Sequence, residues 1–246
     1  MFTQKHEAAF SDLGTLRSVC SACSIPELFA PAGLSEHDIG SIGDIVLASR
    51  KLPKGSYLYR AGDEFSALYA VRTGYLKSTR TLEDGREQVT GFLMAGDLVG
   101  LCGIGSSRHV CNAIALETSE VFAIPFERLE ELSREVPSLQ RHFHRLMSRE
   151  ISREQKLMMM LGSMSAEERL AAFLLDISQQ HMVRGFSPTE FHLRMTRDDI
   201  GSYLGLQLET VSRVISKFKK AGIVEVNQKR VRIADRERLR AVISLA

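Results

Sequence analysis

Between residues 44 and 125, hydrophobic and polar positions alternate over short segments, and turns that contain glycine separate these segments. A period of two is typical of strands with one buried face, and glycine supplies the positive φ that tight turns require. The clearest segments cover residues 68–71, 75–78, 87–93 and 121–124. Many short strands at this spacing predict an antiparallel sandwich or jelly roll.

From Phe126 onward the hydrophobic positions recur at helical spacing. The pattern predicts a short helix over residues 126–134, a break at Pro137, and a long helix after it. Spacings of four and three residues in the long helix form a heptad seam of Phe143, Met147, Glu150, Glu154, Leu157 and Leu161. With Ile151 and Met158 on its flanks, this seam is typical of a dimer interface, although the helix could instead pack on its own domain. Glu150 and Glu154 would face their counterparts and weaken such a dimer.

A further helix over residues 166–184 leads into a two-helix segment, residues 196–222. Thr196 and Asp199 have the spacing of a capping box, which begins a helix by satisfying its free N–H groups. Gly205 marks a tight turn, and the second helix is expected from about Gln207 to Ala221. Its apolar positions are Leu208, Val211, Val214, Ile215 and Phe218. The segment predicts a helix-turn-helix.

Polar residues cover the other face of the second helix: Glu209, Thr210, Ser212, Arg213 and Lys217. Arginine can donate two hydrogen bonds to guanine, glutamate can accept one from cytosine, and serine can bond with any base edge. A solvated face of an ordinary helix is the alternative. The surrounding charge favours DNA, because residues 194–246 hold 12 lysines and arginines against 6 acids, a net charge of +6, whereas the whole chain carries +2. Residues 223–233 alternate and turn at Asn227, which predicts a basic wing hairpin.

Length and composition limit the remaining possibilities. The 246 residues suit two domains, and no apolar run reaches the ~18 residues of a membrane span. We therefore expect a cytoplasmic protein, in which four cysteines are more often metal ligands, redox groups or free thiols than structural disulfides. An enzyme is not expected, because residues 44–125 contain a single histidine, His109, and the chain lacks nucleotide-binding and nucleophile motifs.

Several stretches are shared with one family: KGSYLYRAGD, LYAVRTGYLKS, QVTGFLMAGDLVG, AEERLAAFL, MTRDDIGSYLGL and ETVSRVISKF. With them the chain resembles the FNR branch of the CRP/FNR family of bacterial transcription regulators along nearly its whole length. The resemblance implies an α+β protein with a double-stranded β-helix (jelly-roll, cyclic-nucleotide-binding-like) sensor, a dimerisation helix and a winged helix-turn-helix. We expect a cysteine-bearing segment over residues 1–30 and then these three parts over residues 31–136, 137–163 and 164–246.

The resemblance also implies partners and residue roles. It implies a homodimer on double-stranded DNA of the TTGAT-N4-ATCAA type, read by Glu209, Ser212 and Arg213. It further implies contact with RNA polymerase through surface loops such as the one around Asp84, Gly85 and Arg86.

The resemblance implies a [4Fe–4S] cluster as well, and here the sequence departs from the family. Cys20 and Cys23 match two of the family's four ligands, but Phe29 and Phe122 stand at the other two positions and cannot bind iron. Cys102 and Cys111 are the other thiols. If a hairpin turns at Thr118, residue 113 pairs with 122 and Cys111 lies diagonally beside Phe122, within reach of a relocated site.

Three interpretations of the cysteines remain open. Cys20, Cys23, Cys102 and Cys111 could hold a rearranged cluster, which we favour because the rest of the chain follows the oxygen-sensing branch. Pairs of them could form a dithiol/disulfide sensor, or the protein could respond to another signal. Cyclic nucleotide is not expected, because His109 and Val110 replace the arginine and hydroxyl residue that hold the cyclic phosphate, and no histidine is assigned to haem.

Overall fold

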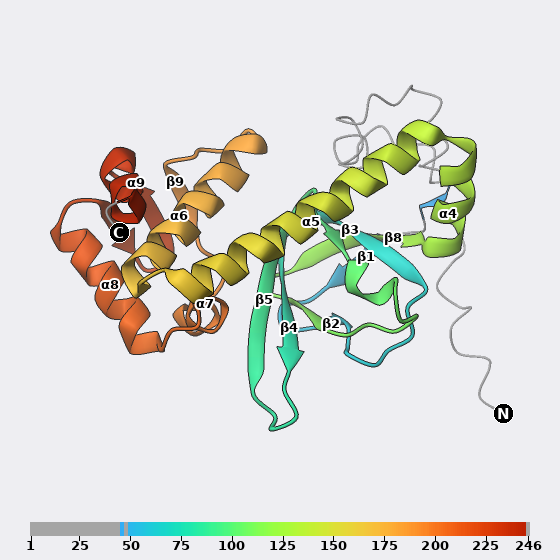
Figure 1. The fold of residues 1–246 in the computed structure, drawn as a ribbon, viewed down its shortest axis with the longest axis horizontal. Coiled ribbons are helices and arrows are strands. Elements are labelled where there is room, and N and C mark those ends of the chain that lie inside the picture. The colour runs from blue at the N-terminus through green and yellow to red at the C-terminus, as the bar shows by residue number, and fades with distance from the viewer. Residues whose placement is uncertain (1–44, 47–48, 245–246) are drawn as a thin grey trace. The chain divides into compact units, whose positions relative to one another are not determined.

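The computed structural model describes residues 45–46 and 49–244, and these fall into two compact units. Residues up to 81 and 90–150 belong to one unit; residues 82–89 and those from 151 onward belong to the other. Strands dominate the first unit and helices dominate the second (Figure 1). No helix among the described residues combines the length and hydropathy needed to cross a membrane.

Two four-stranded sheets form the first unit, in the orders β1-β8-β3-β6 and β2-β7-β4-β5. Its elements are β1 (Ser49–Leu52), β2 (Tyr57–Tyr59), β3 (Ala67–Thr73), β4 (Tyr75–Thr81), β5 (Glu87–Met94), β6 (Leu98–Val99), the 3-10 turn η2 (Leu101–Gly103), β7 (Asn112–Ala115), β8 (Ser119–Pro125) and α4 (Phe126–Glu135). The predicted jelly roll is confirmed.

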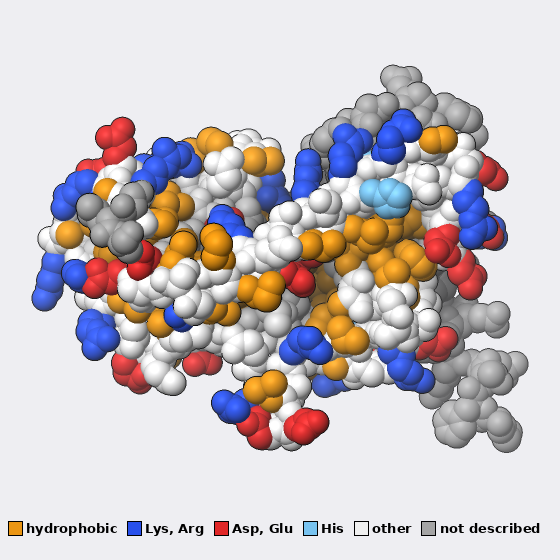
Figure 2. Space-filling view, in the orientation of Figure 1, with side chains coloured by type: hydrophobic (Ala, Val, Ile, Leu, Met, Phe, Trp, Pro, Cys, Tyr) orange, Lys and Arg blue, Asp and Glu red, His pale blue; other side chains and the backbone are white. Residues whose placement is uncertain are grey.

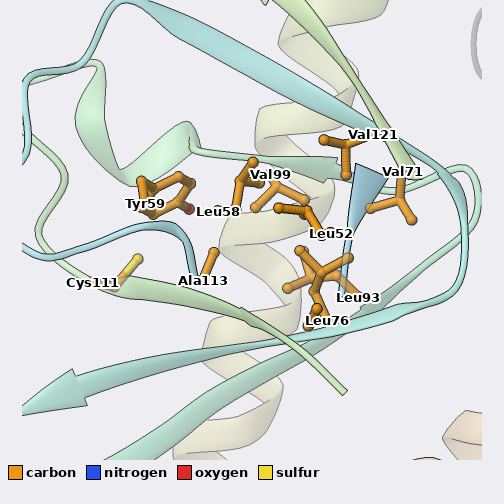
Figure 3. Close-up of a cluster of buried hydrophobic side chains, with 11 residues drawn as sticks. Leu52, Leu58, Tyr59, Val71, Leu76, Leu93, Val99, Cys111, Ala113 and Val121 are labelled. Atoms are coloured by element: carbon orange, nitrogen blue, oxygen red, sulfur yellow. The ribbon is translucent and has the colours of Figure 1, made fainter. Parts of the chain in front are cut away.

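Hydrophobic side chains of the roll separate into two groups. The interior cluster joins both sheets and consists of Leu52, Leu58, Tyr59, Val71, Leu76, Leu93, Val99, Cys111, Ala113, Ala115 and Val121 (Figure 3). The helix-facing cluster joins the β1-β8-β3-β6 sheet to α4 and to the start of α5 (Pro137–Ser163), and consists of Val46, Leu68, Ala70, Phe122, Ile124, Leu129 and Leu139. Val121 and Phe122 belong to different clusters because successive side chains of β8 point to opposite faces.

The predicted hairpin around Thr118 is wrong. Strand β7 pairs with β2 and β4, whereas β8 pairs with β1 and β3, so the chain crosses from one sheet to the other between them. Neighbouring strands often pair directly, but a jelly roll closes its edges by exchanging strands between sheets. Cys111 therefore lies in the interior cluster and Phe122 in the helix-facing cluster. The pairing that would bring Cys111 beside Phe122, within reach of a relocated iron–sulfur site, does not occur.

Helices α6, α7, α8 and α9 and a small sheet of order β10-β11-β9 form the second unit. Its elements are α6 (Ala166–Val183), β9 (Glu190–His192), α7 (Arg197–Leu204), α8 (Leu208–Lys220), β10 (Val224–Asn227), β11 (Arg230–Ile233) and α9 (Arg236–Ser244). The apolar side of α6 supplies much of its core, with Leu170, Ala171, Phe173, Leu174 and Ile177 buried. This is the predicted winged helix-turn-helix.

Candidate nucleic-acid interface and cysteine pair

The helix-turn-helix begins with the capping box expected from the sequence. The Asp199 backbone N–H donates to Thr196 Oγ1 over 3.0 Å, and the Thr196 N–H donates to Asp199 Oδ2 over 2.8 Å. Helix α7 ends at Gly205, whose φ of 62° is left-handed. Both local predictions are confirmed, and together they fix where the turn between the two helices begins.

Gly201 is a turn determinant that sequence reasoning missed. A Cβ atom at this position would lie 2.6 Å from the backbone oxygen of Leu206, which is closer than real Cβ contacts come. The Leu206 N–H also donates to the Gly201 carbonyl over 2.8 Å. The chain therefore crosses α7 at a point where no side chain fits. A glycine inside a helical pattern was the signal in the sequence that could have indicated this close approach.

Helix α8 is anchored by one buried face, formed by Val211, Val214, Ile215 and Phe218. Leu208, which was predicted to share this face, is exposed because it is the first residue of the helix and lies outside the packed turns. Glu209 and Arg213 lie on the exposed face. Neither has a hydrogen bond or ion pair to another described residue, so both are available to an external partner.

The other predicted reading residues are partly engaged within the unit. Ser212 is half-buried, and its hydroxyl accepts a hydrogen bond from Arg197 Nη1 over 3.0 Å. Thr210 is also half-buried. Lys217 Nζ lies 2.5 Å and 2.7 Å from the two carboxylate oxygens of Glu167 on α6, so its charge is already paired.

Charges on the wing are largely paired as well. Arg230 forms an ion pair with Glu190, and Arg232 Nη1 lies 3.1 Å from Glu225 Oε2. The exposed Lys219 and Lys220 in the last turn of α8 have no such partner among the described residues. Figure 2 shows lysine and arginine side chains over the surface of this unit. Lys219 and Lys220 thus offer positive charge at the end of α8 that has no acidic partner in the described part of the chain, whereas Arg230 and Arg232 on the wing are paired with acids.

Arg169 of α6 holds three segments of this unit through backbone carbonyls. Its Nε donates to Met164 O over 2.9 Å, its Nη1 to Leu204 O over 3.0 Å, and its Nη2 to Leu161 O over 2.7 Å. These carbonyls lie at the ends of α5 and α7 and in the turn before α6, where helix carbonyls lack partners of their own. A charged, planar donor satisfies all three at once.

Hydrophobic residues on α5 are divided between the protein interior and solvent. Phe143 packs against the helix-facing cluster, and its ring centroid lies 6.5 Å from that of Phe126. Met147, Glu150, Leu157 and Leu161 are half-buried, and Glu154 is exposed. Ile151 and Met158 remain 57% and 66% exposed. Hydrophobic side chains accordingly reach the surface along the course of α5 in Figure 2.

Cys102 and Cys111 are in direct contact in the β-roll. Cys102 lies in η2 and Cys111 directly precedes β7, and their Sγ atoms are 2.9 Å apart. A hydrogen bond from the Cys111 thiol is the main cause that holds the pKa of Cys102 below its usual range. The same contact, together with burial, raises the pKa of Cys111. One proton shared between two sulfurs explains the opposite directions.

Aromatic rings enclose one side of this pair. The His109 ring stacks on Tyr59 with centroids 3.5 Å apart, and it meets the edge of Phe65. His109 is 2% exposed, and its Nδ1 has no hydrogen-bond partner among the described residues. The Arg108 guanidinium donates to the Gly62 carbonyl, and Val110 is exposed. His109 and Val110 are the two residues that the sequence led us to expect in place of the arginine and hydroxyl of a cyclic-phosphate site.

Two of the four predicted cluster ligands, Cys102 and Cys111, lie in the described part of the chain, and their geometry does not suit a cluster. Cys20, Cys23 and Phe29 lie outside the described residues. Within residues 45–46 and 49–244, no group of three or more histidine, cysteine or acidic side chains could hold a metal ion. Four thiolates hold a [4Fe–4S] cluster, and each binds a different iron, so ligand sulfurs cannot touch each other as those of Cys102 and Cys111 do.

Comparisons with known proteins agree with this architecture. Residues 49–135 match the cyclic nucleotide-binding domain model, and residues 168–242 match the Crp-like helix-turn-helix domain model. The fold is similar to the structure of FixK2 from Bradyrhizobium japonicum, with a TM-score of 0.72 and 30% identity over 79% of this chain and 96% of that one.

Two curated relatives carry the same name, "Fumarate and nitrate reduction regulatory protein". The one from Salmonella typhimurium is 47% identical over 223 residues, which is 91% of this chain and 89% of the relative. The one from Escherichia coli K12 is 47% identical over 220 residues, which is 89% of this chain and 88% of the relative. With identity of this extent over both domains, the chain belongs to the CRP/FNR family, as a DNA-binding transcription regulator of the FNR type.

Proposed function

We propose that the protein binds a TTGAT-N4-ATCAA-like palindrome as a dimer, with α8 of each protomer in the major groove. The observation that carries this proposal is the state of Glu209 and Arg213, which are exposed and without partners among the described residues on a helix whose opposite face is buried. Arginine pairs with guanine O6 and N7, and glutamate accepts from cytosine N4. Lys219 and Lys220 would contact phosphates.

Fluorescence anisotropy on the palindrome and on a scrambled duplex tests this assignment. Arg213→Ala should lose about 1–3 kcal/mol per half-site on the palindrome and little on the scrambled duplex. Lys220→Ala is the matched control, because loss of a phosphate contact weakens both duplexes similarly and reduces the salt dependence. If Arg213→Ala binds the palindrome as tightly as the unchanged protein, the reading helix is misassigned.

We place the dimer interface along the exposed side of α5. Met147, Ile151, Glu154 and Met158 follow spacings of four, three and four residues, which is the heptad pattern. This line keeps Met147 and Glu154 of the seam expected from the sequence and includes its flanking residues Ile151 and Met158. It leaves out the half-buried seam residues Phe143, Glu150, Leu157 and Leu161. Two-fold symmetry of such a dimer matches a palindromic site.

The loop around Gly85 is the proposed contact with RNA polymerase. Gly85 has a φ of 84°, and the exposed Arg86 Nε donates to Asp84 Oδ2 over 2.7 Å. Arg86→Ala should leave palindrome binding unchanged and lower transcription from a promoter with that site in a purified system. Equal transcription at saturating protein would remove this loop from the interface. Because the partners are DNA and polymerase, we place the protein in the cytoplasm.

We propose that the signal is oxygen or the redox state, received by thiols rather than by an iron–sulfur cluster. The sulfur contact between Cys102 and Cys111 supports thiol chemistry, and it argues against these two cysteines as ligands of different irons in one cluster. Iron and acid-labile sulfide in anaerobically purified protein provide the test. Stoichiometric iron that disappears in Cys23→Ser would restore the cluster as the sensor.

A further inference from the structure

We propose that Cys102 and Cys111 form a modification site at which a hydroperoxide produces an intramolecular disulfide. Their Sγ atoms are in contact at 2.9 Å, which brings two nucleophilic groups within reach of bond formation. The inference names the pair and the oxidant for the thiol response proposed above. Disulfide formation is measured chemically, without DNA. A failure of this proposal can therefore be distinguished from a failure of the proposed DNA-binding function.

The connection between the two cysteines is already held in place by backbone hydrogen bonds. The Gly103 N–H donates to Gly100 O over 2.9 Å, the Phe65 N–H to Ser107 O over 3.0 Å, and the His109 N–H to Asp63 O over 2.9 Å. Disulfide formation therefore closes a short loop that the fold has already closed. The entropy that normally opposes ring closure is lost during folding rather than during oxidation.

The two sulfurs differ in access, and this difference assigns their roles. Cys102 is half-buried, whereas Cys111 is 7% exposed and lies beside Tyr59 in the interior cluster (Figure 3). A small peroxide can reach Cys102, while Cys111 is positioned to attack it from inside. A nearby second thiol converts a sulfenic acid to a disulfide before further oxidation occurs.

The reaction balances with one hydroperoxide per pair. The Cys102 thiolate attacks the peroxide, the O–O bond breaks, and the departing oxygen takes up a proton as water or an alcohol. Cys111 sulfur then attacks Cys102 Sγ of the sulfenic acid, the S–O bond breaks, and the hydroxyl leaves as water with the Cys111 proton. The peroxide gains two electrons, which the two thiols supply.

Peptide mapping of the full-length protein tests the proposal. Trypsin cuts after Arg86, Arg108 and Arg128, so Cys102 lies in the peptide 87–108 and Cys111 in the peptide 109–128. Reduced protein is treated with equimolar hydrogen peroxide, alkylated with iodoacetamide, digested without reductant and analysed by mass spectrometry. We expect the two peptides to be joined, two hydrogens lighter than their sum, and to separate on reduction with dithiothreitol.

Variants distinguish this pair from the other cysteines. The double variant Cys20→Ser/Cys23→Ser should form the same linked peptide to the same extent. In Cys111→Ser, Cys102 should accumulate as a sulfenic acid that dimedone traps, and this adduct should be much weaker in the unchanged protein. Non-reducing electrophoresis should show monomers, as an intramolecular bond requires.

Three results would overturn the proposal, and the first two need no substitution. One is full alkylation of both cysteines after peroxide treatment. Another is a link from Cys102 or Cys111 to Cys20, Cys23 or a second chain. The third is dimedone labelling of Cys102 that is equally strong in Cys111→Ser and in the unchanged protein.

Discussion

The Arg197 guanidinium on α7 donates a hydrogen bond to the Ser212 hydroxyl on α8 over 3.0 Å. One lone pair of the Ser212 oxygen is therefore occupied from within the protein, and the hydroxyl hydrogen remains free to donate. Ser212 would thus present mainly a donor to DNA, which suits acceptors such as guanine O6 or thymine O4. Arg197 on α7 thus orients Ser212, one of the proposed reading residues on α8.

A double-mutant cycle on palindrome affinity tests this coupling. Arg197→Ala and Ser212→Ala should each weaken binding, and the double variant should lose less than both effects combined. We expect a coupling of at least about 0.5 kcal/mol, the usual scale for residues in direct contact. Arg197→Ala with Ser216→Ala is the control cycle, because the Ser216 hydroxyl bonds to the backbone of its own helix. Strict additivity in the first cycle would mean that the contact has no role in recognition.

Substitution of Gly201 should destabilise the helix-turn-helix. Gly201→Ala places a methyl group 2.6 Å from the Leu206 carbonyl oxygen, and overpacking of this kind costs about 1–3 kcal/mol. Gly162→Ala is the matched control, because a Cβ there meets nothing within 4 Å and alanine favours the helix. Urea unfolding should show a loss for the first variant and no loss for the second. Equal stability of the two would contradict the close approach.

Glu120 should make the stability of the β-roll depend on acid pH. A hydrogen bond from Ser49, followed by the Arg72 charge with Nη1 3.0 Å from Glu120 Oε1, holds the pKa of Glu120 below its usual range. A glutamate in the unfolded chain has a pKa of about 4.3. The stabilisation from ionised Glu120 is therefore complete above that pH and is lost as the pH falls through the lower pKa of the folded state.

Glu120→Gln should therefore lower the free energy of unfolding at neutral pH by about 1 kcal/mol. In acid, the free energies of unfolding of the variant and of the unchanged protein should become more similar. Glu83→Gln, in an exposed turn, is the control, and its free energy of unfolding should depend on pH in the same way as that of the unchanged protein. If Glu120→Gln lowers the free energy of unfolding by the same amount at every pH, the charge of Glu120 is not the cause of the loss.

Charge on the exposed side of α5 should control dimerisation. Ile151→Asp should dissociate the dimer, whereas Glu154→Ala should strengthen it by removing like charges that face each other. Arg149→Glu changes charge on a different side of the helix and serves as the control. Sedimentation of the four proteins at equal concentration measures the effect. If neither Ile151→Asp nor Glu154→Ala changes the proportions of monomer and dimer, the dimer interface does not lie along this side of α5.

Local rules were sufficient to predict the helix-turn-helix. The capping box of Thr196 and Asp199, the left-handed Gly205 and the buried face of α8 each depend on neighbours within one or two helical turns, so they can be read from spacing. The strand pattern of the roll was predicted for the same reason. Family resemblance supplied the order of the domains.

Features that depend on distant segments were missed. The path of β7 and β8 into different sheets follows from closure of the whole roll, which alternation along one strand does not encode. The contact between Cys102 and Cys111 depends on how the connection after η2 folds back. The ion pair of Lys217 with Glu167 joins residues 50 positions apart, so a charge count alone could not show that this lysine already has an acidic partner.

Arg169 limits where the DNA-binding unit can bend. One guanidinium binds carbonyls at the ends of α5 and α7 and in the turn between α5 and α6, so a swing of α7 about that turn would deprive a half-buried charge of its acceptors. We therefore expect the last turn of α5 to move together with α7. Rotation of this turn would then reposition α7 and, through its packing, the proposed reading helix α8, and the turn at Met164 would not act as a hinge.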